Sequence, residues 1–262
     1  SLAPMMNYRQ IHIAFLAATL FAGAAQGAEA EKPKAADYDT CLNLVAQEPE
    51  TGFDYAQKWL QSDGKQVLAA RHCQAIALSS MGRYEDSAEA LSEVALSMDD
   101  APKQARAEGF AQVADAWMLA GRADRARVAI DQALALDPIA AYLLVRADIR
   151  ASEKDWEGVR NDVSEVLVDQ PTSPDALVLR ATASRNLGHA TSALADATRA
   201  VDIAPHNLSA LLERGRTKAA LFDMPGARAD WQSVIDVARD MGRENDPRAV
   251  AAETFLKAGS GE

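Results

Sequence analysis

The stretch Phe110–Pro138, FAQVADAWMLAGRADRARVAIDQALALDP, decides the fold. Two segments with apolar residues at helical spacing lie on either side of Gly121, and the stretch ends in Pro138. Glycine can adopt the left-handed conformation that ends a helix, and proline cannot continue one. The stretch therefore predicts one helix-turn-helix unit.

The same pattern recurs along the chain with a period of about 34 residues, which indicates a solenoid of helix-turn-helix units. Small residues in the first segment of each unit recur at nearly equal intervals, apart from a longer first interval, and a second set follows them at one constant offset. The two helices of a unit are expected to approach closely at these positions. The first set is Ala75, Ala114, Ala147, Ala181 and Gly215, and the second is Ser87, Ala126, Val159, Ala193 and Ala227.

With small residues, a turn glycine and a terminal proline in this order, the chain resembles the tetratricopeptide repeat (TPR) family. The resemblance covers five units over about residues 65–240. It implies an all-α, right-handed superhelical solenoid of helix-turn-helix repeats. Some units depart from the pattern: Lys154 and Phe222 stand where the others have Gly82, Gly121 and Gly188, and the first and fifth units lack the terminal proline.

The segments beside the array are expected to cap it. Residues 31–64 predict a linker and a degenerate helix pair, and residues 241–262 predict a final helix and a flexible tail.

Residues 1–30 have the layout of a secretory signal peptide: a positive charge, a short apolar run and then small residues. The apolar run Ile11–Ala25 is shorter than the roughly 20 residues of a spanning helix. We therefore expect its removal, a mature chain that begins between residues 25 and 31, and a periplasmic protein with no membrane insertion of its own. The alternative is a protein tethered to the membrane by an uncleaved signal.

The composition argues for a protein partner. A formal net charge of -11 disfavours nucleic acid and anionic membranes, because both would repel the chain. The four histidines make no metal-binding spacing with one another or with cysteine, and the sequence contains no phosphate-binding loop or nucleophile elbow. We therefore expect no catalysis, metal or cofactor.

The two cysteines, Cys41 and Cys73, predict a disulfide. An even number of cysteines in an exported chain favours a bridge, which here would join the N-terminal cap to the first repeat. The alternative is two buried thiols.

Arginine and aspartate residues recur at two fixed positions of the repeat unit. Arginines occupy one phase in the last three units, and aspartates follow them at one constant offset, whereas the first two units have neither. Charges that occur together predict an ion pair between the two helices of one unit, with peptide-binding arginines as the alternative. The predicted pairs are Arg146 with Asp162, Arg180 with Asp196, and Arg214 with Asp230.

In TPR proteins the first helix of each unit lines the concave groove. The resemblance carries one row of residues onto that face, with three further candidates nearby. The row has Asp and Thr where chaperone-binding TPR domains clamp a carboxylate with Lys and Asn, so that clamp is absent. The row changes from acidic to basic along the array, which would orient a bound segment; the alternative is a plain solvated groove. The row is Asp115, Asp148, Thr182 and Arg216, and the neighbours are Gln112, Ser152 and Arg185.

Together these features predict a non-catalytic periplasmic scaffold or adaptor that binds a protein or peptide segment in its concave groove. A scaffold for envelope assembly or secretion that uses the convex face is one alternative. A helical-repeat enzyme or enzyme subunit acting on envelope polymers is the alternative from a different class.

Overall fold

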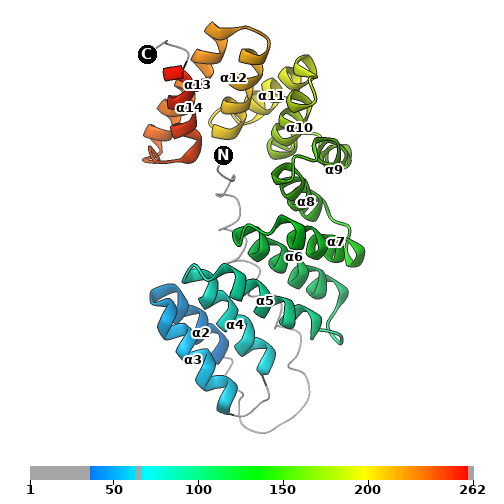
Figure 1. Ribbon diagram of the computed structural model, residues 1–262, viewed down its shortest axis with the longest axis vertical. Helices are drawn as coiled ribbons and strands as arrows, with labels where there is room; N and C mark the ends of the chain where they lie inside the picture. Colours follow the sequence, from blue (N-terminus) through cyan, green and yellow to red (C-terminus); the bar gives the residue numbers. More distant parts are fainter. Residues whose placement is uncertain (1–35, 63–65, 259–262) are drawn as a thin grey trace. The chain divides into compact units, whose positions relative to one another are not determined.

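A computed structural model describes residues 36–62 and 66–258 of the chain, and within these ranges all regular structure is α-helical (Figure 1). Five successive helix pairs make up most of it. They are α4 (Val67–Ser80) with α5 (Tyr84–Leu96), α6 (Lys103–Leu119) with α7 (Ala123–Leu136), α8 (Ala140–Ser152) with α9 (Trp156–Asp169), α10 (Pro174–Asn186) with α11 (Ala190–Ile203), and α12 (Leu208–Ala220) with α13 (Met224–Asp240). The predicted all-α, five-unit fold is confirmed.

The small residues of the repeat lie where the helices of each pair meet. The alanines at the first-helix position and all five residues at the second-helix position are fully buried. In the first pair the Ser87 hydroxyl also donates to the Ala75 carbonyl oxygen at 2.8 Å. Gly215 is required in the fifth pair, because a Cβ atom there would lie 2.6 Å from Nε1 of Trp231.

All five turns within the pairs have the same backbone geometry. The central residue has positive φ in every case: 76°, 73° and 83° in the three glycine turns, 63° at Lys154 and 64° at Phe222. The amide of the residue after it donates back to a carbonyl in the last turn of the helix, as from Asp155 to Arg150 and from Asp223 to Lys218, both at 2.9 Å. A non-glycine residue in this conformation costs about 1 kcal/mol or more.

The two turns without glycine carry a helix cap that the glycine turns lack. The carboxylate of Asp155 accepts from the Gly158 amide at 3.0 Å, and that of Asp223 accepts from the Gly226 amide at 2.9 Å. The residues that begin the next helix after the glycine turns make no such side-chain bond. An N-cap contributes about 1 kcal/mol, which offsets the strain at Lys154 and Phe222.

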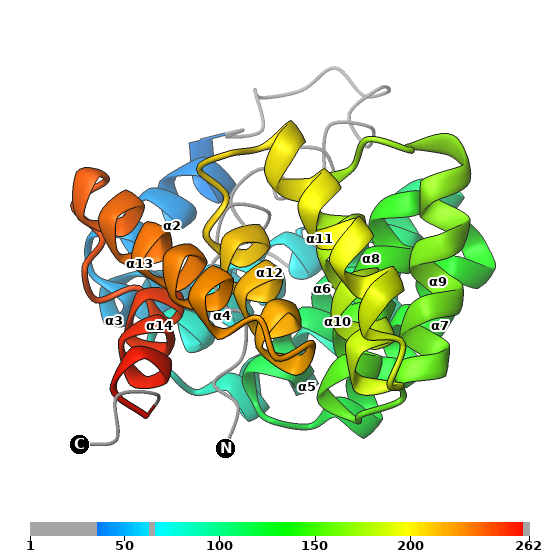
Figure 2. The same cartoon turned by 90° about the horizontal axis from the view of Figure 1, so that it is seen from above.

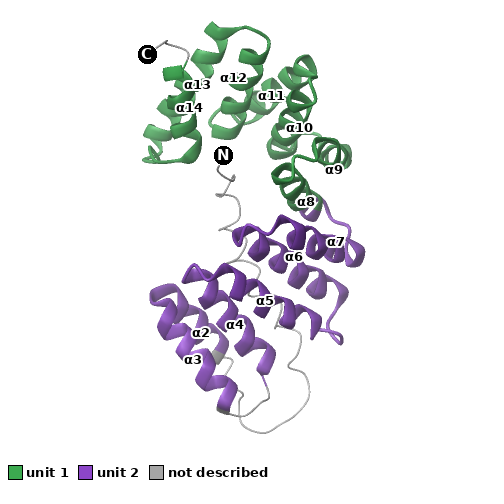
Figure 3. Ribbon diagram, viewed as in Figure 1, with its two compact units in different colours: residues 1–5, 143–262 green, residues 6–142 purple. Residues whose placement is uncertain are grey.

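The described helices form two compact units (Figure 3). Unit 2 contains the described residues up to Tyr142, and unit 1 contains those from Leu143 onward. The first residues of α8 therefore belong to unit 2 and the remainder to unit 1. The repeat pattern alone does not predict this division.

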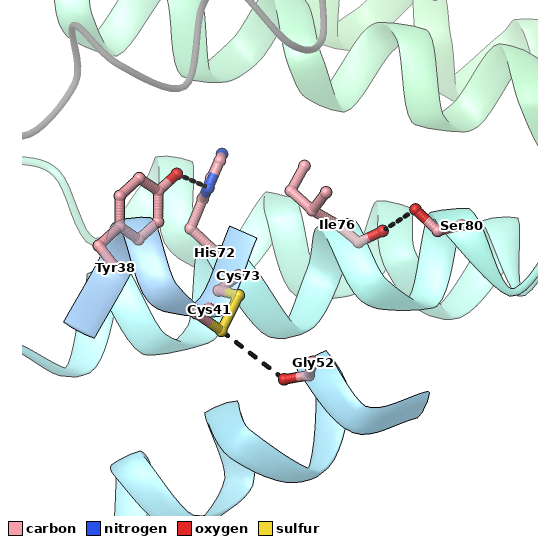
Figure 4. Close-up of a disulfide and its surroundings, with 7 residues drawn as sticks. All are labelled: Tyr38, Cys41, Gly52, His72, Cys73, Ile76 and Ser80. Carbon is pink, nitrogen blue, oxygen red and sulfur yellow. Dashed lines mark hydrogen bonds between the residues drawn. A yellow bond between two sulfur atoms is a disulfide. The ribbon is translucent and has the colours of Figure 1, made fainter. Parts of the chain in front are cut away.

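A helix pair precedes the repeats in unit 2. Helices α2 (Ala36–Gln47) and α3 (Pro49–Ser62) pack against α4. Cys41 of α2 and Cys73 of α4 form a disulfide, with their Cα atoms 6.3 Å apart (Figure 4). The bridge lies inside a buried cluster that includes Val45 and Ala56. The structure thus contains the predicted bridge between cap and first repeat.

Helix α14 (Pro247–Ala258) follows the repeats in unit 1 and lies beside α12 and α13 (Figure 2). The rings of Phe255 in α14 and Trp231 in α13 are 5.2 Å apart. The predicted signal peptide, residues 1–30, lies outside the described residues.

Candidate protein-binding surface

Each predicted arginine contacts its predicted aspartate within its own helix pair, through two hydrogen bonds. The distances are 3.1 and 2.7 Å from Arg146 to Asp162, 2.7 and 2.7 Å from Arg180 to Asp196, and 2.9 and 2.6 Å from Arg214 to Asp230. Because these guanidinium groups face carboxylates across the pair, they join its two helices.

Two of these aspartates neutralise a second cation that the sequence analysis did not find. Arg150 lies 2.8 Å from Asp162, and Lys218 lies 2.8 Å from Asp230. Each second cation follows the first by four residues on the same helix, a spacing that was available as a signal. Arg180 has Ser184 at that spacing, so Asp196 does not gain the same second cation.

In unit 2 the predicted inner row is buried rather than open to solvent. Only 6% of Gln112 and 7% of Asp115 is exposed. Oε1 of Gln112 lies 2.7 Å from Nε2 of His72 in α4, and Nδ1 of His72 lies 2.7 Å from the Tyr38 hydroxyl. The expectation of exposure was wrong for both residues. For Gln112 the reason is its contact with His72, which lies on the first helix of the preceding pair.

The inner row of unit 1 is mixed. Thr182 is 7% exposed, which also contradicts the expected exposure. Asp148 is half-buried, and Ser152 is exposed with its hydroxyl donating to the Ile149 carbonyl oxygen at 2.6 Å. Arg185 and Arg216 meet at a third residue, Glu213, which the sequence analysis did not single out.

We call Arg185, Glu213 and Arg216 the Arg216 cluster. Glu213 is 3% exposed and accepts from Arg185 at 2.6 and 3.4 Å. Arg216 lies 3.8 Å from the same carboxylate, and its guanidinium carbon lies 5.8 Å from the centre of the Phe255 ring. Two positive charges therefore share one negative charge, and Arg216 holds the weaker contact.

The environment of Arg216 is unfavourable for its charge. Burial lowers the pKa of Arg216; Glu213 opposes this shift and the neighbouring charge of Arg185 adds to it. The Arg216 side chain still has 26% of its surface exposed. A carboxylate from another molecule could therefore reach Arg216 and supply the missing negative charge.

Within the described ranges no three His, Cys, Asp or Glu side chains are grouped so that they could hold a metal ion. No described helix has both the length and the apolar character needed to cross a membrane.

No protein-family profile matches the chain, and no curated protein does. Solved structures that are similar to it include the following three. A MamA chain from Desulfovibrio magneticus RS-1 that runs from residue 41 to the end is 17% identical, with a TM-score of 0.58 over 68% of this chain and 98% of that one. The C-terminal part of a TPR repeat-containing protein from Cytophaga hutchinsonii is 12% identical, with a TM-score of 0.61 over 83% of this chain and 85% of that one.

YrrB, described as a TPR protein with an unusual peptide-binding site, is 14% identical, with a TM-score of 0.52 over 76% of this chain and 97% of YrrB. At sequence identities this low, the similarity supports a common fold and nothing further. Together with the five helix pairs, these similarities show that this chain has the tetratricopeptide repeat fold.

Proposed function

We propose that this protein is a non-catalytic, protein-binding scaffold of the periplasm, and that the inner face of unit 1 binds a partner segment through a carboxylate at the Arg216 cluster. The single observation that carries the proposal is the sharing of buried Glu213 by two arginines. The fold supports the general role, because solenoids bury their apolar residues between neighbouring helices and leave one face for partners.

The ligand chemistry follows from the charge of the cluster. Glu213 is already engaged by two hydrogen bonds from Arg185, whereas Arg216 lies at 3.8 Å from it. A partner carboxylate would give Arg216 charge-assisted hydrogen bonds in a half-buried setting, where such bonds are stronger than in water. Since the whole chain carries a formal net charge of -11, a segment with one acidic group suits the site better than a polyanion.

The other inner-row residues have different roles in this proposal. Asp148 and Ser152 reach solvent in unit 1 and are candidate contacts for the same segment. Gln112, Asp115 and Thr182 are buried, so we assign them a role in holding the helices together.

The periplasmic assignment rests on two features. Residues 1–30 have the layout of a secretory signal, and the Cys41–Cys73 disulfide suits an oxidising compartment.

A charge reversal tests the proposal. Arg216→Glu should reduce capture of the partner from periplasmic extract, and should weaken binding of a defined acidic peptide by about tenfold or more. Arg239→Glu is the matched control, because Arg239 is an arginine of unit 1 with 61% of its side chain exposed.

Both variants must keep the circular dichroism and thermal midpoint of the wild type. The proposal is wrong if folded Arg216→Glu recovers the same proteins in the same yield. An uncharged version of the peptide, with Gln in place of Glu, should bind wild type and variant equally.

A further inference from the structure

Phe222 is an unusual residue for its position in the turn between α12 and α13. It has φ of 64° where three other turns have glycine, and 92% of its surface is exposed. The ring is therefore not buried within its own chain. Leu221 and Met224 beside it are 38% and 37% exposed. We call Leu221–Met224 the apolar turn. Neighbouring exposed apolar side chains of this kind form a candidate interaction surface.

Unit 2 contains a pocket of about 330 Å³ between α5, α6 and α7. Its buried wall is formed by Phe110, Val113 and Trp117. Leu96 and Val128 also line it, and each is 61% exposed. The volume is at the lower end for ligand sites, so the pocket suits one large apolar side chain better than an extended ligand.

We propose that the apolar turn of one copy inserts Phe222 into the unit 2 pocket of a second copy, so that the protein associates with itself head to tail. Aromatic side chains that fill pockets are the usual anchors of protein interfaces. The contact returns to Phe222 the burial that its own chain does not provide.

The two surfaces offer one pair of opposite charges, Asp223 in the apolar turn and Arg125 at the pocket. Asp223 is exposed and follows Phe222 directly. Asp124 and Arg125 both line the pocket. Asp124 is paired with Arg122 at 3.2 Å, whereas Arg125 lies 3.9 Å from the Glu89 carboxylate and has its guanidinium carbon 4.4 Å above the Trp117 ring. Arg125 is thus held over the pocket by a ring contact and a long ion pair, in a position to attract Asp223.

The type of assembly follows from the two surfaces. The apolar turn and the pocket are different patches, so each copy offers one of each, and the contact is heterologous. Repeated contacts give an open chain or a ring, in contrast to a twofold dimer. A contact centred on one side chain is small, so the association should be weak and concentration-dependent.

Phe222→Gly is the decisive variant, because glycine removes the ring and suits the left-handed turn. Sedimentation velocity should show the average mass of the wild type rising with concentration and that of Phe222→Gly staying at the monomer value. Lys154→Gly is the matched control, since Lys154 has φ of 63° in another pair. It should associate like the wild type, and neither variant should have a lower thermal midpoint.

Val128→Glu tests the pocket. The corresponding position of the first pair is Glu89, so a glutamate suits this helix. The variant should stay monomeric, whereas Val168→Glu, at a site with 79% exposure on α9, should associate like the wild type. A mixture of Phe222→Gly and Val128→Glu should form a one-to-one pair and nothing larger, because only one productive contact remains.

Three results would overturn the inference: a wild type that is monomeric up to about 1 mM, association of Phe222→Gly equal to that of the wild type, or no pairing in the mixture. Arg216→Glu should leave self-association unchanged. This result separates the inference from the proposed function, and either one can fail without the other.

Discussion

The buried ion pairs predict a graded loss of stability when the aspartate is removed. The Asp230 side chain is 4% exposed and neutralises both Arg214 and Lys218, whose side chains are 19% and 22% exposed. The Asp196 side chain is 14% exposed and pairs with Arg180, which is 29% exposed. Breaking a buried pair costs about 3–5 kcal/mol, because the partner charge is stranded. We expect Asp230→Ala to cost about 4 kcal/mol and Asp196→Ala about 2 kcal/mol, since the second site retains more solvent.

Urea unfolding followed by circular dichroism measures both losses. Asp236→Ala is the control on the same helix as Asp230, because its side chain is 51% exposed and its pair with Arg239 should contribute less than about 1 kcal/mol. Adding Lys218→Met to Asp230→Ala should recover part of the loss, since one stranded charge is removed. The reasoning is refuted if Asp230→Ala costs no more than Asp236→Ala, or if the Asp196 variant loses as much as the Asp230 variant.

Three further perturbations test other parts of the fold. Burial lowers the pKa of His72 below its ordinary value of 6.5, although its hydrogen bond to a glutamine opposes the shift. The neutral ring therefore contributes its full share to the free energy of unfolding above about pH 6.5. As the pH falls from there toward the pKa of the folded state, the unfolded chain takes up a proton that the folded chain does not, and the free energy of unfolding drops by at most about 1.4 kcal/mol per pH unit. The variant His72→Gln should lack this slope. Reduction of the Cys41–Cys73 bridge, whose residues are 32 apart in sequence, should lower the free energy of unfolding by about 4 kcal/mol in denaturant titrations, and two reactive thiols in the oxidised protein would contradict this. Gly215→Ala should lower the thermal midpoint, because overpacking beside Trp231 destabilises the fold by about 1–3 kcal/mol. Gly109→Ala should leave the midpoint unchanged, because a Cβ atom at Gly109 would lie 3.4 Å from its nearest neighbour, an ordinary contact distance.

The sequence predicts features that repeat with the period of the fold. Small residues such as Ala114 and Ala181 recur at fixed intervals because every pair needs the same close approach. The three arginine–aspartate pairs also follow from phase, since one offset in the sequence serves each of them.

Features that occur once in the array leave no periodic signal. Glu213 pairs with Arg185 of the preceding helix pair, at an offset that the three arginine–aspartate pairs do not share. The burial of Gln112 depends on His72 of the preceding pair, which phase within one unit does not reveal. Phase within one unit therefore does not predict how closely the neighbouring helix covers a residue.

The turn at Lys154 shows another limit. The absence of glycine there, and at Phe222, suggests a different turn, yet the backbone is the same as in the glycine turns. The local signal was in the following residues, where an aspartate and a glycine three positions later form a helix cap. One turn geometry is thus encoded in two ways.

The Cys41–Cys73 bridge makes the two ends of the array unequal. A linear array opens from its ends, because a terminal helix has neighbours on one side only. At the N-terminal end α2 is tied covalently to α4, so the cap cannot peel away alone. At the other end α14 is held by contacts such as that of Phe255 with Trp231. Local unfolding should therefore start at α14, next to Arg216. A partner bound at Arg216 would then also stabilise the less stable end of the array.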